Sequence, residues 1–315
     1  MSVAKQASDW LGGIIADVPT PFTERGEIDH ATFARLCERQ ACAGADAILI
    51  CDIAGEAATL TLSERTALIR TAVAIARGRI RVIVGAGSNA TRHAIAWTQL
   101  AEAAGADAVM SVVPYYNRPT QDGIAAHFHA IASATRLPIV LHDAPARCAR
   151  ALSDDTLLRL ADLPRMIGLC SDDGVASRVV RLRQRLPAGF RLLSGDDTAG
   201  LSYLLVGGDG VVSATANVAP QLCRGMVVAC RQGQTRYAAT IMRMLTPLAA
   251  ALAPDMVAPA VKYALSLRGL ARPCVRLPLV ELGDAEQRAV ADALEEIWAT
   301  PELPALRWQR GWRRS

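Results

Sequence analysis

Lysine is almost absent from this chain of 315 residues. Arginine is abundant, whereas lysine occurs only at Lys5 and Lys262. The sequence also lacks the run of about 20 apolar residues that a membrane-spanning helix needs. No apolar signal-peptide segment precedes Asp9. We therefore expect a soluble, cytoplasmic protein with no membrane partner.

Paired cysteine motifs are also missing, although the chain has eight cysteines. None of them forms a Cys-x-x-Cys pair, and most lie within apolar helical or strand patterns. Such placement favours reduced, buried thiols over disulfides or zinc sites. The cysteines are Cys37, Cys42, Cys51, Cys148, Cys170, Cys223, Cys230 and Cys274.

Charge is sparse and nearly balanced. The formal net charge is +4, and 51% of the residues are hydrophobic, which indicates a globular protein and excludes a disordered one. A basic cluster with tryptophans appears only within residues 301–315. We interpret this segment as a flexible, solvated tail and expect no nucleic-acid partner.

Short runs rich in Ile and Val alternate with longer helical patterns along most of the chain. The runs are continuously apolar, as expected of parallel strands that are buried on both faces. Eight such units predict a single (β/α)8 barrel over residues 1–233, with its active site at the C-terminal ends of the strands. Beyond it, residues 234–300 are expected to form a helical extension of the same domain. The runs cover residues 13–18, 47–51, 81–85, 108–113, 138–142, 166–170, 191–194 and 210–213.

Polar residues mark the starts of several predicted helices. Asp29, Ser63 and Ser153 each precede a helical pattern and are predicted N-caps, because their side-chain oxygens can accept from unpaired amides. Asp196 and Asp197 follow the seventh run and are interpreted in the same way, as caps of a helix over residues 198–206.

Five motifs in order make the chain similar to a known family. The chain resembles the dihydrodipicolinate synthase and N-acetylneuraminate lyase family, which are pyruvate-dependent class I aldolases on a (β/α)8 barrel with a C-terminal helical extension. The motif at 114–119 is closer to the synthase branch. The five motifs are Gly-Glu-x-x-Thr-Leu at 55–60, Gly-x-Gly-x-Asn-Ala-Thr at 85–91, Pro-Tyr-Tyr-Asn-Arg-Pro at 114–119, Ser-Gly-Asp-Asp at 194–197 and Gly-Val-x-Ser-x-Thr-Ala-Asn-Val at 210–218.

The resemblance also shows where this sequence departs from the family. The family places a lysine at the end of strand six, where it forms a Schiff base with pyruvate. Cys170 stands at that position. His142 replaces the proton-transferring tyrosine of strand five, and Ile53 and Ala54 replace a threonine pair after strand two. Ordinary Schiff-base synthase activity is therefore not expected.

Other positions agree with the family and imply a site for a small keto or hydroxy acid. Tyr116 matches a tyrosine that the family inserts from a neighbouring subunit, which implies a homotetramer or a homodimer. Arg147 matches an arginine that binds a substrate carboxylate. Ala54, Gly55 and Ser213 are expected to contact the substrate, and no cofactor is expected.

Three interpretations of the altered site remain open. In the first, Cys170 fills an apolar slot in a non-catalytic, ligand-binding or regulatory scaffold. In the second, an altered lyase uses His142 for proton transfer, since its ordinary pKa suits chemistry near neutral pH. Cys170 then acts as a thiolate if Arg147 or His142 lies close enough to lower its pKa.

The third interpretation is a metal-assisted site. Several possible ligands fall near predicted strand ends, and imidazole, carboxylate and thiolate groups all bind zinc. Their spacing follows no metal motif, so the sequence alone gives us no metal site to expect. The possible ligands are Asp52, His142, Asp143, Cys170, Asp172 and Asp173.

Overall fold

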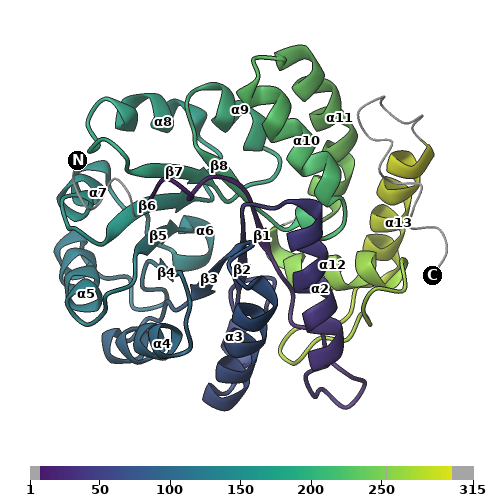
Figure 1. Ribbon diagram of the computed structural model, residues 1–315, viewed down its shortest axis with the longest axis horizontal. Helices are drawn as coiled ribbons and strands as arrows, with labels where there is room; N and C mark the ends of the chain where they lie inside the picture. The colour runs from purple at the N-terminus through teal and green to yellow at the C-terminus, as the bar shows by residue number, and fades with distance from the viewer. Residues whose placement is uncertain (1–7, 253, 300–315) are drawn as a thin grey trace.

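The computed structural model describes residues 8–252 and 254–299, so the predicted basic tail lies outside the described residues. Eight parallel strands form a closed barrel in which each strand pairs with the next and β8 pairs with β1 (Figure 1). The predicted (β/α)8 barrel is confirmed. The strands are β1 (Gly13–Asp17), β2 (Ala47–Ile50), β3 (Arg81–Gly85), β4 (Ala108–Val112), β5 (Ile139–Asp143), β6 (Met166–Ser171), β7 (Arg191–Ser194) and β8 (Gly210–Ser213).

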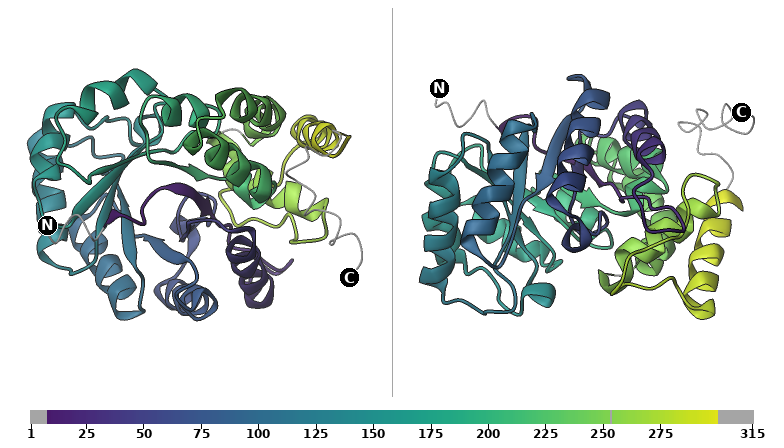
Figure 2. Two further views of the ribbon diagram at one scale, coloured as in Figure 1. Left: turned by 45° about the horizontal axis from the view of Figure 1, so that its top comes forward. Right: turned by 90° about the horizontal axis from the view of Figure 1, so that it is seen from below.

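Helices follow the strands and surround the barrel (Figure 2). The helices of this ring are α2 (His30–Ala43), α3 (Leu62–Ala76), α4 (Thr91–Ala103), α5 (Gln121–Ser133), α6 (Pro145–Cys148), α7 (Asp154–Ala161), α8 (Ala176–Arg183), α9 (Gly200–Leu205) and α10 (Pro220–Arg231). Three short 3₁₀ segments accompany them, η1 (Ala57–Thr59), η2 (Thr215–Asn217) and η3 (Pro254–Met256).

Three further helices form the predicted C-terminal helical part. They are α11 (Thr235–Ala251), α12 (Val257–Ser266) and α13 (Asp284–Ala299). Figure 1 shows α12 and α13 to one side of the barrel, in light green and yellow, and α11 packs against both α10 and α13. Within the residues described, no helix combines the length and apolar character needed to cross a membrane.

Two apolar layers hold the barrel together. One lies between the strands and the helices, and the other fills the barrel interior with residues such as Ile15, Val140 and Leu193. Side chains alternate between the two layers because successive residues of a strand point to opposite faces. This alternation decides which residues at the strand ends face the mouth of the barrel.

The helix starts were predicted with mixed success. Asp29 and Ser153 are N-caps, and their side chains accept hydrogen bonds from the amides of Thr32 and Thr156. The prediction for Ser63 is wrong. Thr61 caps α3 instead, because its hydroxyl and the carboxylate of Glu64 bond each other's backbone amides in a capping box.

The predicted caps at Asp196 and Asp197 are also wrong. Asp196 accepts hydrogen bonds from the amide and hydroxyl of Thr198, which forms a turn, and α9 begins only at Gly200. Asp197 accepts hydrogen bonds from the amide and hydroxyl of Thr215, which follows β8. Asp197 therefore joins the loop after β7 to the loop after β8, whereas the bonds of Asp196 to Thr198 lie within the loop after β7.

Candidate active site at the barrel mouth

A cavity of about 240 Å³ opens at the C-terminal ends of the strands, where barrel enzymes place their active sites. None of its lining residues, all within the described part of the chain, is a lysine. The polar residues that line it are Asp17, Asp52, His142, Arg147, Cys170, Asp172, Asp196, Asp197, Thr198 and Asp255.

Strand alternation and register explain how the central groups meet. His142 of β5 lies two residues after interior-facing Val140, and Asp17 of β1 lies two residues after interior-facing Ile15. His142 pairs in register with Cys170 of β6, so the two side chains are neighbours across adjacent strands. The sequence prediction that these two residues share the strand ends is consistent with this register.

His142 is held by carboxylates on both sides. Its Nε2 lies 3.0 Å from each carboxylate oxygen of Asp172, and its Nδ1 lies 3.9 Å from Asp52 Oδ2. Burial of the imidazole lowers its pKa, but the charge and hydrogen bond of Asp172 outweigh burial and raise the pKa to about 9. Asp52 and then Asp17 act in the same direction.

Asp17 and Asp52 are acids of the same cluster, Asp17 buried and Asp52 partly buried. Burial, and then the charge of Asp52, raises the pKa of Asp17 well above its ordinary value. Burial also raises the pKa of Asp52, against the opposing charges of His142 and Arg147. The amide of Ala54 donates to Asp17 Oδ2 at 2.9 Å, but within the described part of the chain Asp17 Oδ1 has no hydrogen-bond partner.

Cys170 does not have the environment of a thiolate nucleophile. Its side chain is fully buried, and burial raises its pKa well above the ordinary value of a thiol. The charges of Asp172 and Asp52 raise it further. The hypothesis that Arg147 or His142 lowers this pKa is therefore wrong, because the surrounding charge is mainly negative.

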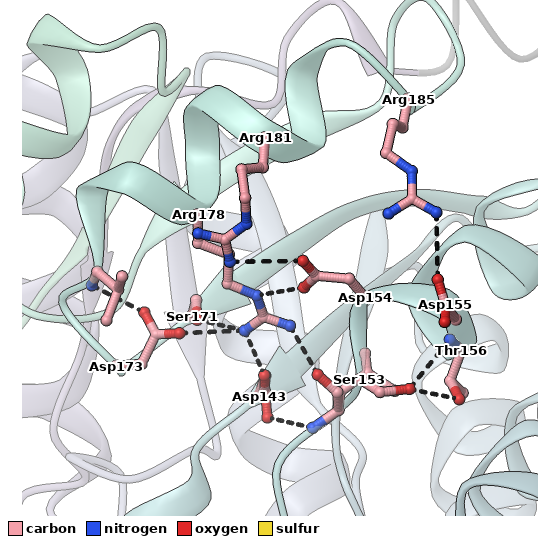
Figure 3. A network of polar contacts seen from close by, with 12 residues as sticks. Asp143, Ser153, Asp154, Asp155, Thr156, Ser171, Asp173, Arg178, Arg181 and Arg185 are labelled. Carbon is pink, nitrogen blue, oxygen red and sulfur yellow. Dashed lines mark hydrogen bonds and ion pairs between the residues drawn. The ribbon is translucent and has the colours of Figure 1, made fainter.

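The neighbouring acids Asp143 and Asp173 belong to a different network (Figure 3). Arg178 of α8 donates to Asp143 Oδ2 at 2.7 Å and to Asp173 Oδ2 at 3.1 Å. The other oxygen of Asp143 accepts from the amide of Leu152, and the side chain of Asp143 is fully buried. Both carboxylates therefore brace the outside of the barrel and are not candidates for ligands at its mouth.

Three of the remaining possible ligands do come together. One ligand atom from each of His142, Cys170 and Asp172 lies within 4.8 Å of the other two. The sequence spacing gave no sign of this group, because β5 and β6 are separated by α6 and α7 and only the barrel register brings them side by side.

Three predicted substrate-binding residues do not line the cavity. They are Ala54 and Gly55 after β2, and Ser213 at the end of β8. Ala54 gives its amide to Asp17, and the carbonyl of Gly55 accepts from the hydroxyl of Thr20 at 2.8 Å. The hydroxyl of Ser213 accepts from the amide of Ala216. Arg147 does line the cavity, and its role in binding a substrate carboxylate stays a prediction.

Tyr116 lies outside the cavity. Its side chain is 89% exposed, and its backbone has a positive φ of 70°, which is uncommon for a residue other than glycine. The loop after β4 therefore presents this ring to the outside of the single chain. A role for Tyr116 in catalysis stays a prediction that depends on a second copy of the chain.

Asp17 is the residue that the sequence interpretation missed. The signal was present, because Asp17 ends an otherwise apolar strand at a position that faces the barrel interior. A carboxyl group is rarely buried with one oxygen unbonded, because burial of a polar atom without a partner costs free energy.

A larger hollow of about 760 Å³ lies at the opposite end of the barrel. It is lined by residues at the starts of strands and in helix ends, such as Pro138, Met166 and Pro187. The charged cluster lies at the other end, which identifies the smaller cavity as the candidate active site.

A model of the dihydrodipicolinate synthetase family matches residues 10–297. The chain belongs to this family. A 4-hydroxy-tetrahydrodipicolinate synthase of Thiobacillus denitrificans is 42% identical over 282 residues, which cover 90% of this chain and 95% of the relative. The predicted likeness to the synthase branch is confirmed.

Solved structures of the dihydrodipicolinate synthetase family agree with this fold. The 4-hydroxy-tetrahydrodipicolinate synthase of Methylacidiphilum fumariolicum is 36% identical, with a TM-score of 0.89 over 91% of this chain and 96% of that one. A chloride-inhibited dihydrodipicolinate synthase of Acinetobacter baumannii, complexed with pyruvate, is 34% identical, with a TM-score of 0.88 over 92% of this chain and 100% of that one.

Proposed function

We propose that this family member is a lyase that binds a small oxo or hydroxy acid at the barrel mouth and polarises it without a Schiff base. The observation that carries the proposal is the pairing of His142 with Asp172 at 3.0 Å beside Cys170, on a cavity wall without lysine among the residues described. The pyruvate complex of the relative from Acinetobacter baumannii supports the substrate class.

The chemistry of Cys170 supports the loss of the Schiff base. An iminium forms from an amine, and a thiol has no nitrogen to form one. The resemblance places the family's lysine at position 170. Cleaving or forming a bond at the carbon next to a carbonyl then needs another group that stabilises the developing oxyanion or enolate.

His142 and Arg147 are the groups that fit these tasks. Arg147 lines the cavity and offers a planar cation that suits a carboxylate. His142, oriented by Asp172, would act as a general acid that donates its proton to the substrate carbonyl oxygen as the bond at the neighbouring carbon breaks. Asp172 is thus a positioning residue, and His142 is the proposed catalytic residue.

A second copy of the chain belongs to the same proposal. The exposed ring of Tyr116 lies on the loop after β4, as the family resemblance implies for a residue that enters a neighbouring site. We propose a homo-oligomer, a tetramer or a dimer, in which this ring completes the site of the adjacent copy.

A non-catalytic scaffold is the second candidate. The observation in its favour is the loop after β2, where the amide of Ala54 and the carbonyl of Gly55 are bonded to Asp17 and Thr20. A loop that is bonded within the protein in this way has fewer free groups for a substrate carboxylate.

Turnover measurements decide between the two. Wild type is screened with 2-oxo and 2-hydroxy acids, alone and with aldehydes, beside His142→Gln and the control His129→Gln. His129 is an exposed histidine on α5. The lyase proposal predicts turnover in wild type and in the control, and a loss on the order of 10²-fold or more in His142→Gln. Negligible turnover in all three proteins, with ligand binding retained, contradicts it and favours the scaffold.

A further inference from the structure

We propose that the mouth of this barrel binds a divalent transition-metal ion, with zinc as the best match, on His142, Cys170 and Asp172. Their ligand atoms lie within 4.8 Å of one another. Imidazole nitrogen, thiolate sulfur and carboxylate oxygen are the three donor types that zinc takes in proteins. Three protein ligands with an open fourth position are typical of a catalytic zinc site.

The backbone around the cluster leaves room for these side chains. A Cβ atom on Gly195 would lie 1.9 Å from Asp172 Oδ1 and 3.1 Å from Cys170 Sγ. A Cβ atom on Gly85 would lie 2.8 Å from Asp52 Oδ1. Gly85 is the last residue of β3 and Gly195 directly follows β7, so the absence of their side chains leaves the space that Asp52 and Asp172 occupy.

A buried polar atom outside the group of three ligands also points to a bound ligand. Asp17 Oδ1 and His142 Nδ1 have no hydrogen-bond partner within the described residues, although the two side chains are only 5% and 3% exposed. Both residues line the cavity. Buried polar atoms are almost always paired in native proteins, and a cation or its bound water would pair Asp17 Oδ1, whereas His142 Nδ1 faces Asp52.

The charge of the cluster favours a cation over an anion. Three carboxylates, those of Asp17, Asp52 and Asp172, surround the imidazole of His142. Two of them, Asp17 and Asp52, lie outside the group of three ligands and would bond a water in the open fourth position. A site of this composition is built from soft and hard donors together, which favours zinc over magnesium or calcium.

Binding of the ion is balanced by the loss of two protons. The Cys170 thiol becomes a metal-bound thiolate, the His142 imidazolium becomes the neutral imidazole that coordinates, and both protons leave to solvent. With the ion bound, His142 and Asp172 serve as its ligands, and the ion takes over from His142 the polarisation of a substrate carbonyl or hydroxyl oxygen as a Lewis acid. This consequence rests on the proposed function, whereas the binding of the ion does not.

Cobalt is the probe that tests the site directly. Untagged full-length protein is treated with a chelator, freed of it by gel filtration, and titrated with Co²⁺ alone. The proposal predicts saturation at one Co²⁺ per chain, a thiolate-to-cobalt charge-transfer band in the near ultraviolet, and displacement of the band by Zn²⁺.

Variants assign the ligands. Cys170→Ser should abolish the charge-transfer band, and Asp172→Asn should weaken Co²⁺ binding at least about tenfold. Cys37→Ser is the matched control, because Cys37 is also buried but lies on α2 in the outer layer, and its band should equal that of wild type. A band that persists in Cys170→Ser, or is lost in Cys37→Ser, overturns the assignment.

The wild type alone keeps the proposal falsifiable if a variant fails to fold. Absence of a charge-transfer band at saturating Co²⁺, or metal content well below one ion per chain after Zn²⁺ loading, overturns the site. Metal binding without turnover contradicts the proposed function but supports the site. Turnover that is unchanged by a chelator, in protein that binds no Co²⁺, contradicts the metal site but supports the proposed function.

Discussion

Lys262 of α12 and Glu56 of the loop after β2 form an ion pair in which neither side chain is exposed. The amino group of Lys262 also donates to the carbonyl of Cys274 at 2.9 Å and lies 4.0 Å from the centre of the Phe22 ring. Lys262 is the one lysine within the described residues, and it does not line the cavity. Its amino group is therefore committed to joining the C-terminal helices to the barrel.

Lys262→Met should destabilise the protein strongly. The substitution leaves the carboxylate of Glu56 buried without its cation, which typically costs about 3–5 kcal/mol. The free energy of unfolding from urea titrations measures the loss. Arg159→Met is the control, because Arg159 pairs with Asp122 on the surface and should lose less than about 1 kcal/mol. Equal, small losses in the two variants would show that the buried pair does not contribute to the free energy of unfolding.

The fold was predictable from the sequence because its signals are local and repeated. Eight apolar runs with intervening helical patterns are enough for a closed barrel, and each predicted run overlaps an observed strand. Helix starts were less certain. Ser63 and Thr61 are both good capping residues, and only the position of Glu64 relative to Thr61 decides between them.

Stability in mild acid should depend on His127. Burial lowers the pKa of His127 from 6.5 to about 4, so between these values the unfolded chain binds a proton that the folded chain excludes. The stability contributed by neutral His127 is complete above about pH 6.5 and falls as the pH drops towards 4. Between pH 7 and pH 5, the free energy of unfolding should therefore fall by about 2 kcal/mol less in His127→Gln than in the wild type.

Urea unfolding at the two pH values, for wild type, His127→Gln and His129→Gln, measures this effect. His129 is exposed on the same helix α5 and serves as the control. An identical pH dependence in wild type and His127→Gln would contradict the prediction.

Gly195→Ala should damage the site more than the fold. The new Cβ atom would lie 1.9 Å from Asp172 Oδ1, so the carboxylate must turn away from His142. We expect turnover of the best substrate to fall at least about tenfold, as for other losses of an orienting group. Gly225→Ala on α10 is the control, since its Cβ atom would meet Ile241 at an ordinary 3.5 Å. Unchanged turnover in Gly195→Ala would show that Asp172 does not orient His142.

The site was only partly predictable. His142, Cys170 and Arg147 were found because the family motifs mark strand ends. The cluster itself depends on the register of β5 with β6 and on the inward side of β1, and neither can be obtained from the spacing of residues along the chain. Asp143 and Asp173 were equally plausible acids in the sequence, and only their bonds to Arg178 remove them from the site.

Reduction with borohydride in the presence of pyruvate tests the central claim, that this barrel acts without a Schiff base. Cys170→Lys, combined with His142→Tyr and Ala54→Thr, serves as the reference protein and should trap pyruvate as a stable adduct. Wild type should show no change of mass under the same conditions. A covalent pyruvate adduct on any lysine of the wild-type protein, located by peptide mapping, would contradict the account.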